Sequence, residues 1–174
     1  MDWFRKKDKP KRQDPKEERT VKTEGLWLKC PGCEQMLFKR EVVENLSVCP
    51  KCGHHRRINA TERLRLLFDD EKWEELDSNL VSSDPLEFTD TKTYSRRLEE
   101  MRQTTGLLDA LITGEGTIGS YPVIISAMEL AFVGGSLGAV VGEKITRAIE
   151  RAVERRCPLI VVSASGGARM QEGA

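Results

Sequence analysis

The sequence lacks the features that mark membrane and exported proteins. No apolar run approaches the roughly 20 residues that a membrane-spanning helix needs. The N-terminus has no hydrophobic signal core, and it is too rich in acidic residues for a transit peptide. The 28 Lys and Arg balance the 28 Asp and Glu, so the net charge of zero gives no long-range attraction to nucleic acid or a membrane. We therefore expect a soluble, cytoplasmic protein with no membrane segment.

Histidine is scarce as well, and this excludes a common catalytic class. The only two histidines, His54 and His55, are adjacent, so Ser163 and Ser165 have no histidine nearby in the sequence. That argues against a hydrolase with a Ser/His/Asp triad. The glycine-rich turns at 134–136 and 165–168 match neither the GxxxxGK[ST] phosphate loop nor the GxGxxG fingerprint with an acidic residue downstream. Chemistry that needs no protein nucleophile is favoured.

Cysteine carries the strongest motif in the chain. Four of the five cysteines form two CxxC pairs about fifteen residues apart: Cys30, Cys33, Cys49 and Cys52. Two thiolates two residues apart in a tight turn can both reach one ion at about 2.3 Å. Gly53 supplies the positive φ that the second turn needs after its last ligand. The pattern predicts one zinc ion, and four thiolates leave it no open position, so its role is structural.

Other uses of these cysteines are possible. Two disulfides would need an oxidising compartment. A redox motif would have a single CxxC beside a βαβ unit. An iron–sulfur cluster also takes four thiolates, with other spacings. We interpret His54 and His55 as solvated loop residues and Cys157 as a small hydrophobic residue.

The chain divides into three predicted segments. Residues 1–24 are charged and nearly free of apolar groups, which predicts a disordered tail or a weak electrostatic arm. Residues 25–57 read as a zinc ribbon of short strands and hairpins, too small to fold without its metal. Residues 58–174 read as part of an α/β domain.

The α/β segment begins with local helix and hairpin signals. Asn59 offers a cap for a helix from Thr61, and Trp73 and Leu76 read as extending its amphipathic surface. A second helix is expected over 93–105. Residues 110–119 and 121–128 read as strands joined by a hairpin tip at Gly119-Ser120.

A long amphipathic helix and a buried strand follow. Apolar residues from Val141 to Val153 recur at helical spacing, Ile149 among them, and Lys144 falls on the charged outer face. Pro158 ends this helix, and the apolar run 159–162 predicts a strand buried on both faces. Residues 163–169 then turn into another helix, which completes a right-handed βαβ unit.

Two glycine-rich turns are the candidate catalytic elements. Gly134-Gly135 and Gly166-Gly167 each lie between a predicted strand and a predicted helix. Unpaired N–H groups at such a helix start can hold a phosphate or an oxyanion. A single turn of this kind is often only a tight connection. Two of them at one end of a sheet predict backbone donors that converge on a carbonyl oxygen.

These motifs together resemble one family. The residues that carry the resemblance are CPGC at 30–33, CPKCGHH at 49–55, PLEF at 85–88 with Asp90 and Tyr94, MELAFVGGSLG at 128–138, and SASGGARMQEG at 163–173. In this order they are similar to the beta subunit of the bacterial and plastid acetyl-CoA carboxylase carboxyltransferase. The resemblance runs from about Gly25 to the last residue.

The resemblance implies a crotonase-like (ClpP/crotonase) domain behind the ribbon and a defined reaction. Carboxylate would pass from carboxybiotin to acetyl-CoA and give malonyl-CoA, the first committed step of fatty acid synthesis. An alpha subunit would complete the site, a biotin carboxyl carrier protein would bring the carboxybiotin, and biotin carboxylase would load it. The amides near Gly135 and Gly167 would receive the charge of a thioester enolate. Phosphates of CoA could meet some of five arginines: Arg56, Arg57, Arg96, Arg97 and Arg102.

Length and the ribbon leave alternatives open. Members of this family continue beyond position 174, so we expect this chain to be C-terminally truncated and inactive by itself, even with an alpha subunit. Cations around the knuckles allow weak nucleic-acid binding through the ribbon, although they also offset the charge of a zinc tetrathiolate. The glycine turns would equally suit a related acyl-CoA carboxylase or a decarboxylase subunit.

Overall fold

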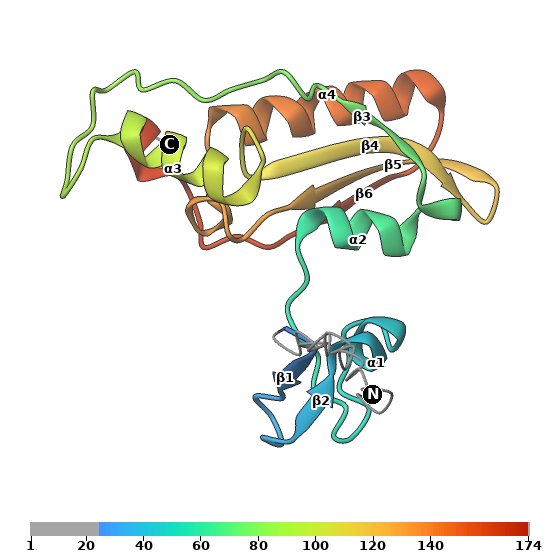
Figure 1. Ribbon diagram of the computed structural model, residues 1–174. Helices are drawn as coiled ribbons and strands as arrows, with labels where there is room; N and C mark the ends of the chain where they lie inside the picture. The colour runs from blue at the N-terminus through green and yellow to red at the C-terminus, as the bar shows by residue number, and fades with distance from the viewer. Residues whose placement is uncertain (1–24, 174) are drawn as a thin grey trace, which may run out of the picture. The chain divides into compact units, whose positions relative to one another are not determined.

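The computed structural model describes residues 25–173. The tail predicted over 1–24 lies outside the described residues. The chain divides into two compact units between His54 and His55 (Figure 1). Within residues 25–173, none of the helices combines the length and apolar character needed to cross a bilayer.

The first unit is a small hairpin with one helix. Its elements in chain order are β1 (Trp27–Lys29), β2 (Met36–Phe38) and α1 (Lys39–Glu44). The strands are antiparallel with Leu28 opposite Leu37, and Leu37 and Val42 pack with the cysteines in its core. The sequence predicted the strands but missed α1. This helix has no side-chain cap and buries only Val42, so it carries neither a start signal nor an apolar stripe.

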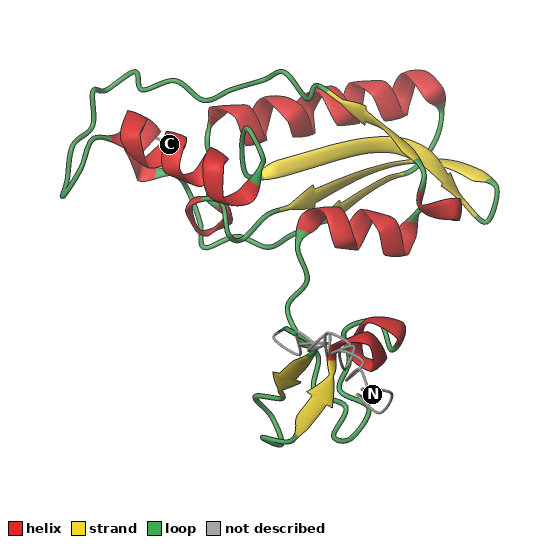
Figure 2. Cartoon of the chain, in the orientation of Figure 1, coloured by secondary structure: helices red, strands yellow, loops and turns green. Residues whose placement is uncertain are grey.

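The second unit is a four-stranded sheet with helices on both faces (Figures 1 and 2). Its helices and strands are α2 (Ala60–Leu67), β3 (Trp73–Leu76), α3 (Tyr94–Thr105), β4 (Leu111–Ile118), β5 (Tyr121–Met128), α4 (Ala139–Arg155) and β6 (Leu159–Val162). Three short 3-10 helices join them: η1 (Asp69–Glu71), η2 (Val133–Gly135) and η3 (Met170–Glu172). The strand order is β3-β4-β5-β6, antiparallel except for the parallel pair β5 and β6.

The central hairpin forms where the sequence predicted it. Strands β4 and β5 pair from Leu111 opposite Met128 to Ile118 opposite Tyr121. The tip residues Gly119 and Ser120 both have positive φ, as a tight two-residue hairpin requires. Their N–H groups donate to the Asp69 carboxylate, each at 2.8 Å.

Alternation along β5 divides the core between two helices. Val123, Ile125 and Ala127 pack with Leu64 of α2 and with Phe68, which directly follows this helix. On the other face, Ile124 packs with Ala148 and Ala152 of α4. The period of two along the strand thus places one helix on each face of the sheet.

Trp73 and Leu76 belong to strand β3 and do not extend helix α2, so that prediction was wrong. Trp73 pairs with Gly116 of β4 and stacks on Phe68, with ring centroids 5.8 Å apart. A Cβ on Gly114 would lie 2.7 Å from the Trp73 ring, and one on Gly116 would lie 2.7 Å from Phe68. The glycines of β4 therefore make room for the aromatic pair, a tertiary effect that local spacing does not reveal.

The long helix α4 has the predicted position, and Val141, Ala148 and Ala152 are buried as predicted, but other residues depart from the predicted faces. Lys144, expected on the outer face, is buried, and its Nζ donates to the carbonyl of Leu111 at 3.1 Å. Ile149 and Val153, expected inside, are 49% and 73% exposed. The sheet covers only part of the apolar stripe of α4. The helical turn that contains Lys144 packs against β4.

The last strand departs from its prediction in one respect. Strand β6 is parallel to β5, as the βαβ pattern predicted, with Ile125 opposite Ile160. It is not buried on both faces, because Ile160 and Val161 are 38% and 41% exposed. Among the described residues β6 pairs only with β5, and no other strand covers its second edge.

Candidate active site and metal centre

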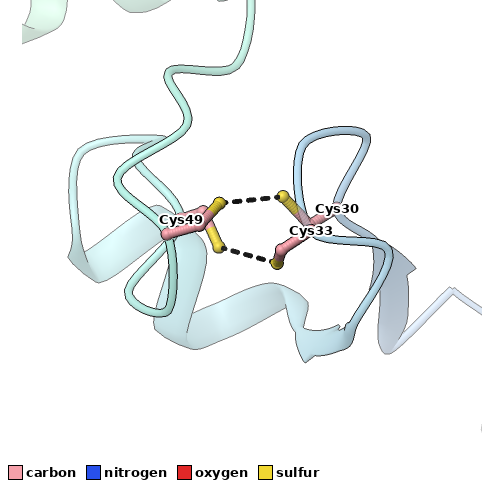
Figure 3. A group of neighbouring side chains, drawn as sticks. Cys30, Cys33 and Cys49 are labelled. Carbon is pink, nitrogen blue, oxygen red and sulfur yellow. Dashed lines mark hydrogen bonds between the residues drawn. The ribbon is translucent and has the colours of Figure 1, made fainter.

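The four cysteines of the first unit gather at one point. Their Sγ atoms all lie within 4.8 Å of one another. Cys30 Sγ is 3.7 Å from Cys52 Sγ, and Cys33 Sγ is 3.9 Å from Cys49 Sγ (Figure 3). A tetrahedron with metal–sulfur bonds of about 2.3 Å has sulfur–sulfur edges of about 3.8 Å. Two of the six edges have this length and the others are at most 4.8 Å, so the donor set fits zinc, and neither histidine belongs to it.

The two CxxC turns have the same backbone pattern. The carbonyl of Cys30 accepts from Glu34 N–H at 2.8 Å, and that of Cys49 accepts from Gly53 N–H at 2.9 Å. Glu34 and Gly53 hold equivalent positions with φ of 59° and 72°. The second knuckle thus meets the positive φ with glycine, as predicted, whereas the first meets it with glutamate.

Hydrogen bonds and burial move the pKa values of the Cys30 and Cys52 thiols in opposite directions. The Cys33 N–H stabilises the Cys30 thiolate and lowers its pKa to about 6. The His54 N–H favours the Cys52 thiolate, but burial and hydrogen bonds with the other cysteines outweigh it and raise the pKa to about 12. A metal that binds all four as thiolates therefore displaces protons.

In the second unit the two glycine turns are joined directly by backbone hydrogen bonds. Gly166 N–H donates to the Gly134 carbonyl at 2.9 Å. Leu137 N–H then donates to the Gly167 carbonyl, and Arg169 N–H to the Leu137 carbonyl, each at 2.9 Å. Because β5 and β6 are parallel, both turns leave the same end of the sheet. The sequence-based expectation that they share one end is met.

Close packing of the turns explains one of the glycines. A Cβ on Gly135 would lie 2.0 Å from the carbonyl oxygen of Ala164, and Gly135 has φ of +65°. A Cβ on Gly134 or Gly167 would meet nothing within 4 Å. Gly135 is therefore needed for turn-to-turn contact, whereas Gly134 and Gly167 face open space.

The amide N–H groups of the turns are already partly engaged. Gly135 N–H donates to the Phe132 carbonyl at 2.9 Å, and Gly167 N–H to Ser165 Oγ at 3.0 Å. Within residues 25–173, the N–H groups of Gly134 and Ala168 have no acceptor. An anion would find those two donors free, and it could replace the exposed Ser165 hydroxyl at Gly167.

The helix ends near the turns differ from the prediction. Helix α4 begins at Ala139, three residues after the turn, and its first N–H donates to Glu172 Oε2 at 2.6 Å. The second turn leads into the three-residue helix η3 rather than an α-helix. Glu172 thus occupies the helix start that the sequence offered to a ligand, and the candidate donors are amides of the turns themselves.

A cavity of about 510 Å³ lies beside the turns. Its lining includes Ala164 and Ala131, which precede the two turns, and Arg57 and Arg63, which form no ion pair within the described residues. Glu129, on the same lining, is buried and accepts the Ala60 N–H at the start of α2 at 2.8 Å. The lining of the cavity thus combines apolar side chains near the turns with the positive charges of Arg57 and Arg63.

The other arginine candidates are mostly engaged on α3. Arg97 donates twice to Asp90, Arg96 pairs with Glu100, and Arg102 donates to the Ser82 carbonyl. Arg56 also has an interaction partner. Of the five, only Arg57 lines the cavity.

Sequence reasoning missed the charged groups that support the turns. Arg169, Asp109 and Glu129 are buried, and Glu172 is largely so. The signal was available for two of them, since Glu129 interrupts an apolar run and Arg169 follows a glycine turn. Charges in such settings indicate internal partners rather than solvent.

Comparison with known proteins assigns both units. Residues 57–174 match the family described as "Carboxyl transferase domain", and residues 27–52 match "Acetyl-CoA carboxylase zinc finger domain". The chain belongs to the carboxyl transferase family. This agrees with the expected zinc ribbon followed by a partial crotonase-like α/β domain, and with a four-cysteine zinc centre.

Similar carboxyl transferase proteins are close in sequence. The chain is 47% identical over 173 residues to "Acetyl-coenzyme A carboxylase carboxyl transferase subunit beta" of Trichormus variabilis. It is 45% identical over 178 residues to the protein of that name from Prochlorococcus marinus subsp. pastoris. These matches cover 99% of this chain and 55% and 59% of the relatives, so it spans little more than half their length.

Solved structures show the same fold. A transcarboxylase 12S structure with methylmalonyl-coenzyme A bound aligns with a TM-score of 0.55 and 27% identity, over 78% of this chain and 23% of the other. A Pseudomonas malonate decarboxylase hetero-tetramer aligns with a TM-score of 0.50 and 26% identity, over 75% and 44%.

Proposed function

We propose that this chain forms the acyl-CoA side of a carboxyltransferase that moves a carboxyl group from carboxybiotin to acetyl-CoA and forms malonyl-CoA. The observation that carries the proposal is the pair of hydrogen-bonded glycine turns within the carboxyl transferase match, behind an acetyl-CoA carboxylase zinc finger. The fold alone would suit several acyl-CoA reactions. The zinc finger match favours acetyl-CoA.

The chemistry needs electrostatic stabilisation more than a protein base. Carboxybiotin, as the second substrate, supplies CO2 and a basic ureido anion that takes a proton from the acetyl methyl group. The electron pair left behind places negative charge on the thioester oxygen, and the methyl carbon then attacks CO2. Preorganised N–H donors aimed at that oxygen lower the barrier, and one such donor is worth about 3–4 kcal/mol in other enzymes.

Among the four candidate glycines, the geometry favours Gly134 and Gly167. Gly134 N–H has no acceptor within residues 25–173, and Gly167 N–H is held only by an exposed serine hydroxyl. Gly135 and Gly166 use their N–H groups to build and join the turns. In this proposal they shape the site while Gly134, Gly167 and the neighbouring Ala168 amide contact the oxygen.

The cavity beside the turns suits the rest of the thioester. Met128, Leu130 and Ala164 supply apolar surface, and Arg57 and Arg63 supply positive charge for phosphates. We therefore assign the acyl-CoA to this cavity, with its thioester toward Ala164.

The proposed reaction requires partner proteins. Residues 25–173 supply amide donors and cations, while the reaction also needs a biotin-bearing surface. We infer an alpha subunit that completes the site, a biotin carboxyl carrier protein and a biotin carboxylase. Free thiols grouped for zinc fit a cytoplasmic location.

The test uses an extended subunit, in which these 174 residues are followed by the part of the Trichormus variabilis relative that they do not match. It is mixed with the alpha subunit and the carboxylated carrier protein, and malonyl-CoA formation is measured. Gly167→Ala should lower kcat about 100-fold, the cost of roughly 1 Å of misplacement. Gly106→Ala, also at positive φ with open space around it but outside the turns, is the matched control.

Three outcomes would count against the proposal. Absence of malonyl-CoA with the unmodified extended subunit contradicts the function. Faster carboxylation of propionyl-CoA than of acetyl-CoA assigns the chain to a related acyl-CoA carboxylase. Equal losses in Gly167→Ala and Gly106→Ala would show that the turn has no special role.

A further inference from the structure

Arg169 is the most deeply buried charged group in the described part of the chain. Its side chain is fully buried, and so is that of its ion-pair partner Asp109. Two parallel bonds join them, from Nη2 to Oδ1 at 2.8 Å and from Nη1 to Oδ2 at 3.1 Å. A buried guanidinium persists only where its donors are satisfied and its charge is paired.

Two further hydrogen bonds from Arg169 hold the first glycine turn. Nε donates to Ser136 Oγ at 2.9 Å, and Nη2 donates to the Ser136 carbonyl at 2.9 Å. Ser136 directly follows Gly135, while Arg169 lies two residues after Gly167. One side chain from the second turn is thus bonded to the backbone of the first.

Other groups fix the guanidinium in place from the protein side. Asp109 is itself held by the Ala110 N–H at 2.7 Å and by the Ser82 hydroxyl. Nη1 also donates to Tyr94 on α3 at 3.3 Å, and the guanidinium lies 5.6 Å from the Phe132 ring centroid. Burial raises the pKa of Asp109, but bonds from Arg169 and Ser82 outweigh it and lower that pKa, so the pair stays charged.

We propose that Arg169, anchored by Asp109, is a positioning residue that sets the register between the two glycine turns. The effect of Arg169 on turnover rests on the proposed function, whereas its effect on the alignment of the two turns does not. Register matters because the N–H groups of Gly134 and Gly167 lie on different turns and must meet one oxygen. A shift of either turn would leave both donors present but misaimed.

Lysine cannot replace arginine in this role. A lysine ammonium is one point charge, whereas holding the two turns together needs a planar guanidinium. One edge of that group donates to Asp109 and another to Ser136. Arg169→Lys therefore keeps the charge and removes the geometry. Ser136→Ala is the milder variant, because it deletes only the bond from Nε and leaves the ion pair intact.

The first measurement is amide hydrogen exchange on the 174-residue chain. Arg169→Lys should lower the protection of the Gly166 and Leu137 amides, which bridge the turns, by about tenfold or more, and Ser136→Ala should lower it by less. Ile125 in the sheet should keep its protection. Two matched controls should leave the protection of the Gly166 amide unchanged. Arg151→Lys alters a partly exposed ion pair, and Ser126→Ala removes a buried hydroxyl that is hydrogen-bonded to Thr113.

The second measurement is steady-state kinetics of the extended subunit with its partners. Arg169→Lys and Ser136→Ala should lower kcat, by about 100-fold and several-fold, with the KM for acetyl-CoA within about threefold of the unmodified value. The two control variants should retain kcat.

Three outcomes would overturn parts of this proposal. If Arg169→Lys leaves the protection of the Gly166 amide unchanged, or lowers the protection of Ile125 by the same factor, the positioning role is overturned. Lost protection with unchanged kcat overturns its link to catalysis. If the unmodified enzyme makes no malonyl-CoA, the proposed function fails, and Gly166 exchange still decides whether Arg169 ties the turns.

Discussion

Replacing Glu34 with glycine should strengthen zinc binding. Glu34 has φ of 59° at the position equivalent to Gly53 in the other knuckle. A non-glycine residue in this conformation costs about 1–2 kcal/mol, and the added flexibility of glycine in the unfolded chain returns about 0.5–1 kcal/mol of that. Its ion pair with Lys29 is exposed on both sides and contributes little. The net expectation is a gain of about 0.5 kcal/mol.

The assay is zinc affinity, because metal binding and folding of a small ribbon are one equilibrium. A gain of about 0.5 kcal/mol corresponds to roughly twofold tighter binding in competition with a chromophoric chelator. Gly53→Ala should do the reverse, with a loss of about 1 kcal/mol and roughly fivefold weaker binding. Glu34→Gln, which keeps the positive φ and removes the charge, isolates the ion pair. Weaker zinc binding by Glu34→Gly than by Glu34→Gln would refute the reasoning.

Three further predictions concern the metal, the turns and acid. Removing zinc with a chelator should abolish amide protection in residues 25–54 while β4 and β5 keep theirs; simultaneous loss in both units would contradict their independence. Gly135→Ala should destabilise the chain much more than Gly119→Ala, because its Cβ would overlap the Ala164 carbonyl whereas Gly119 faces open space; equal melting temperatures would contradict this packing. The N–H groups of Ser120 and Gly119 and the Thr117 hydroxyl lower the pKa of Asp69, so its stabilising effect is present above about pH 4 and lost as pH falls through the lowered pKa. Asp69→Asn should flatten that acid dependence in thermal melts, and an unchanged pH profile would exclude the role of Asp69.

Local patterns predicted the parts of the fold that are locally determined. The β4–β5 hairpin followed from alternation and a Gly-Ser tip, and α3 lies within the helix predicted over 93–105. The zinc centre followed from the spacing of the two CxxC pairs, and the four Sγ atoms do gather within 4.8 Å of one another.

The errors share a physical origin in tertiary contacts. Lys144 is buried because its Nζ donates a hydrogen bond to the Leu111 carbonyl, and Trp73 is in a strand because β4 glycines leave room for its ring. The sequence placed the glycine turns at one end of the sheet, but it did not reveal that the Gly135 N–H donates to the Phe132 carbonyl. Glu172 caps α4 from 33 residues away, a contact that no local motif encodes.

The most direct test of the central claim is the carbonyl stretch of [1-13C]acetyl-CoA bound to the extended subunit, measured by infrared difference spectroscopy. N–H groups of the two turns should polarise the thioester carbonyl and move the band to lower wavenumber than in water. Gly167→Ala should return it toward the solution value, while Gly106→Ala should not. A bound thioester whose carbonyl band matches that in water would contradict the account.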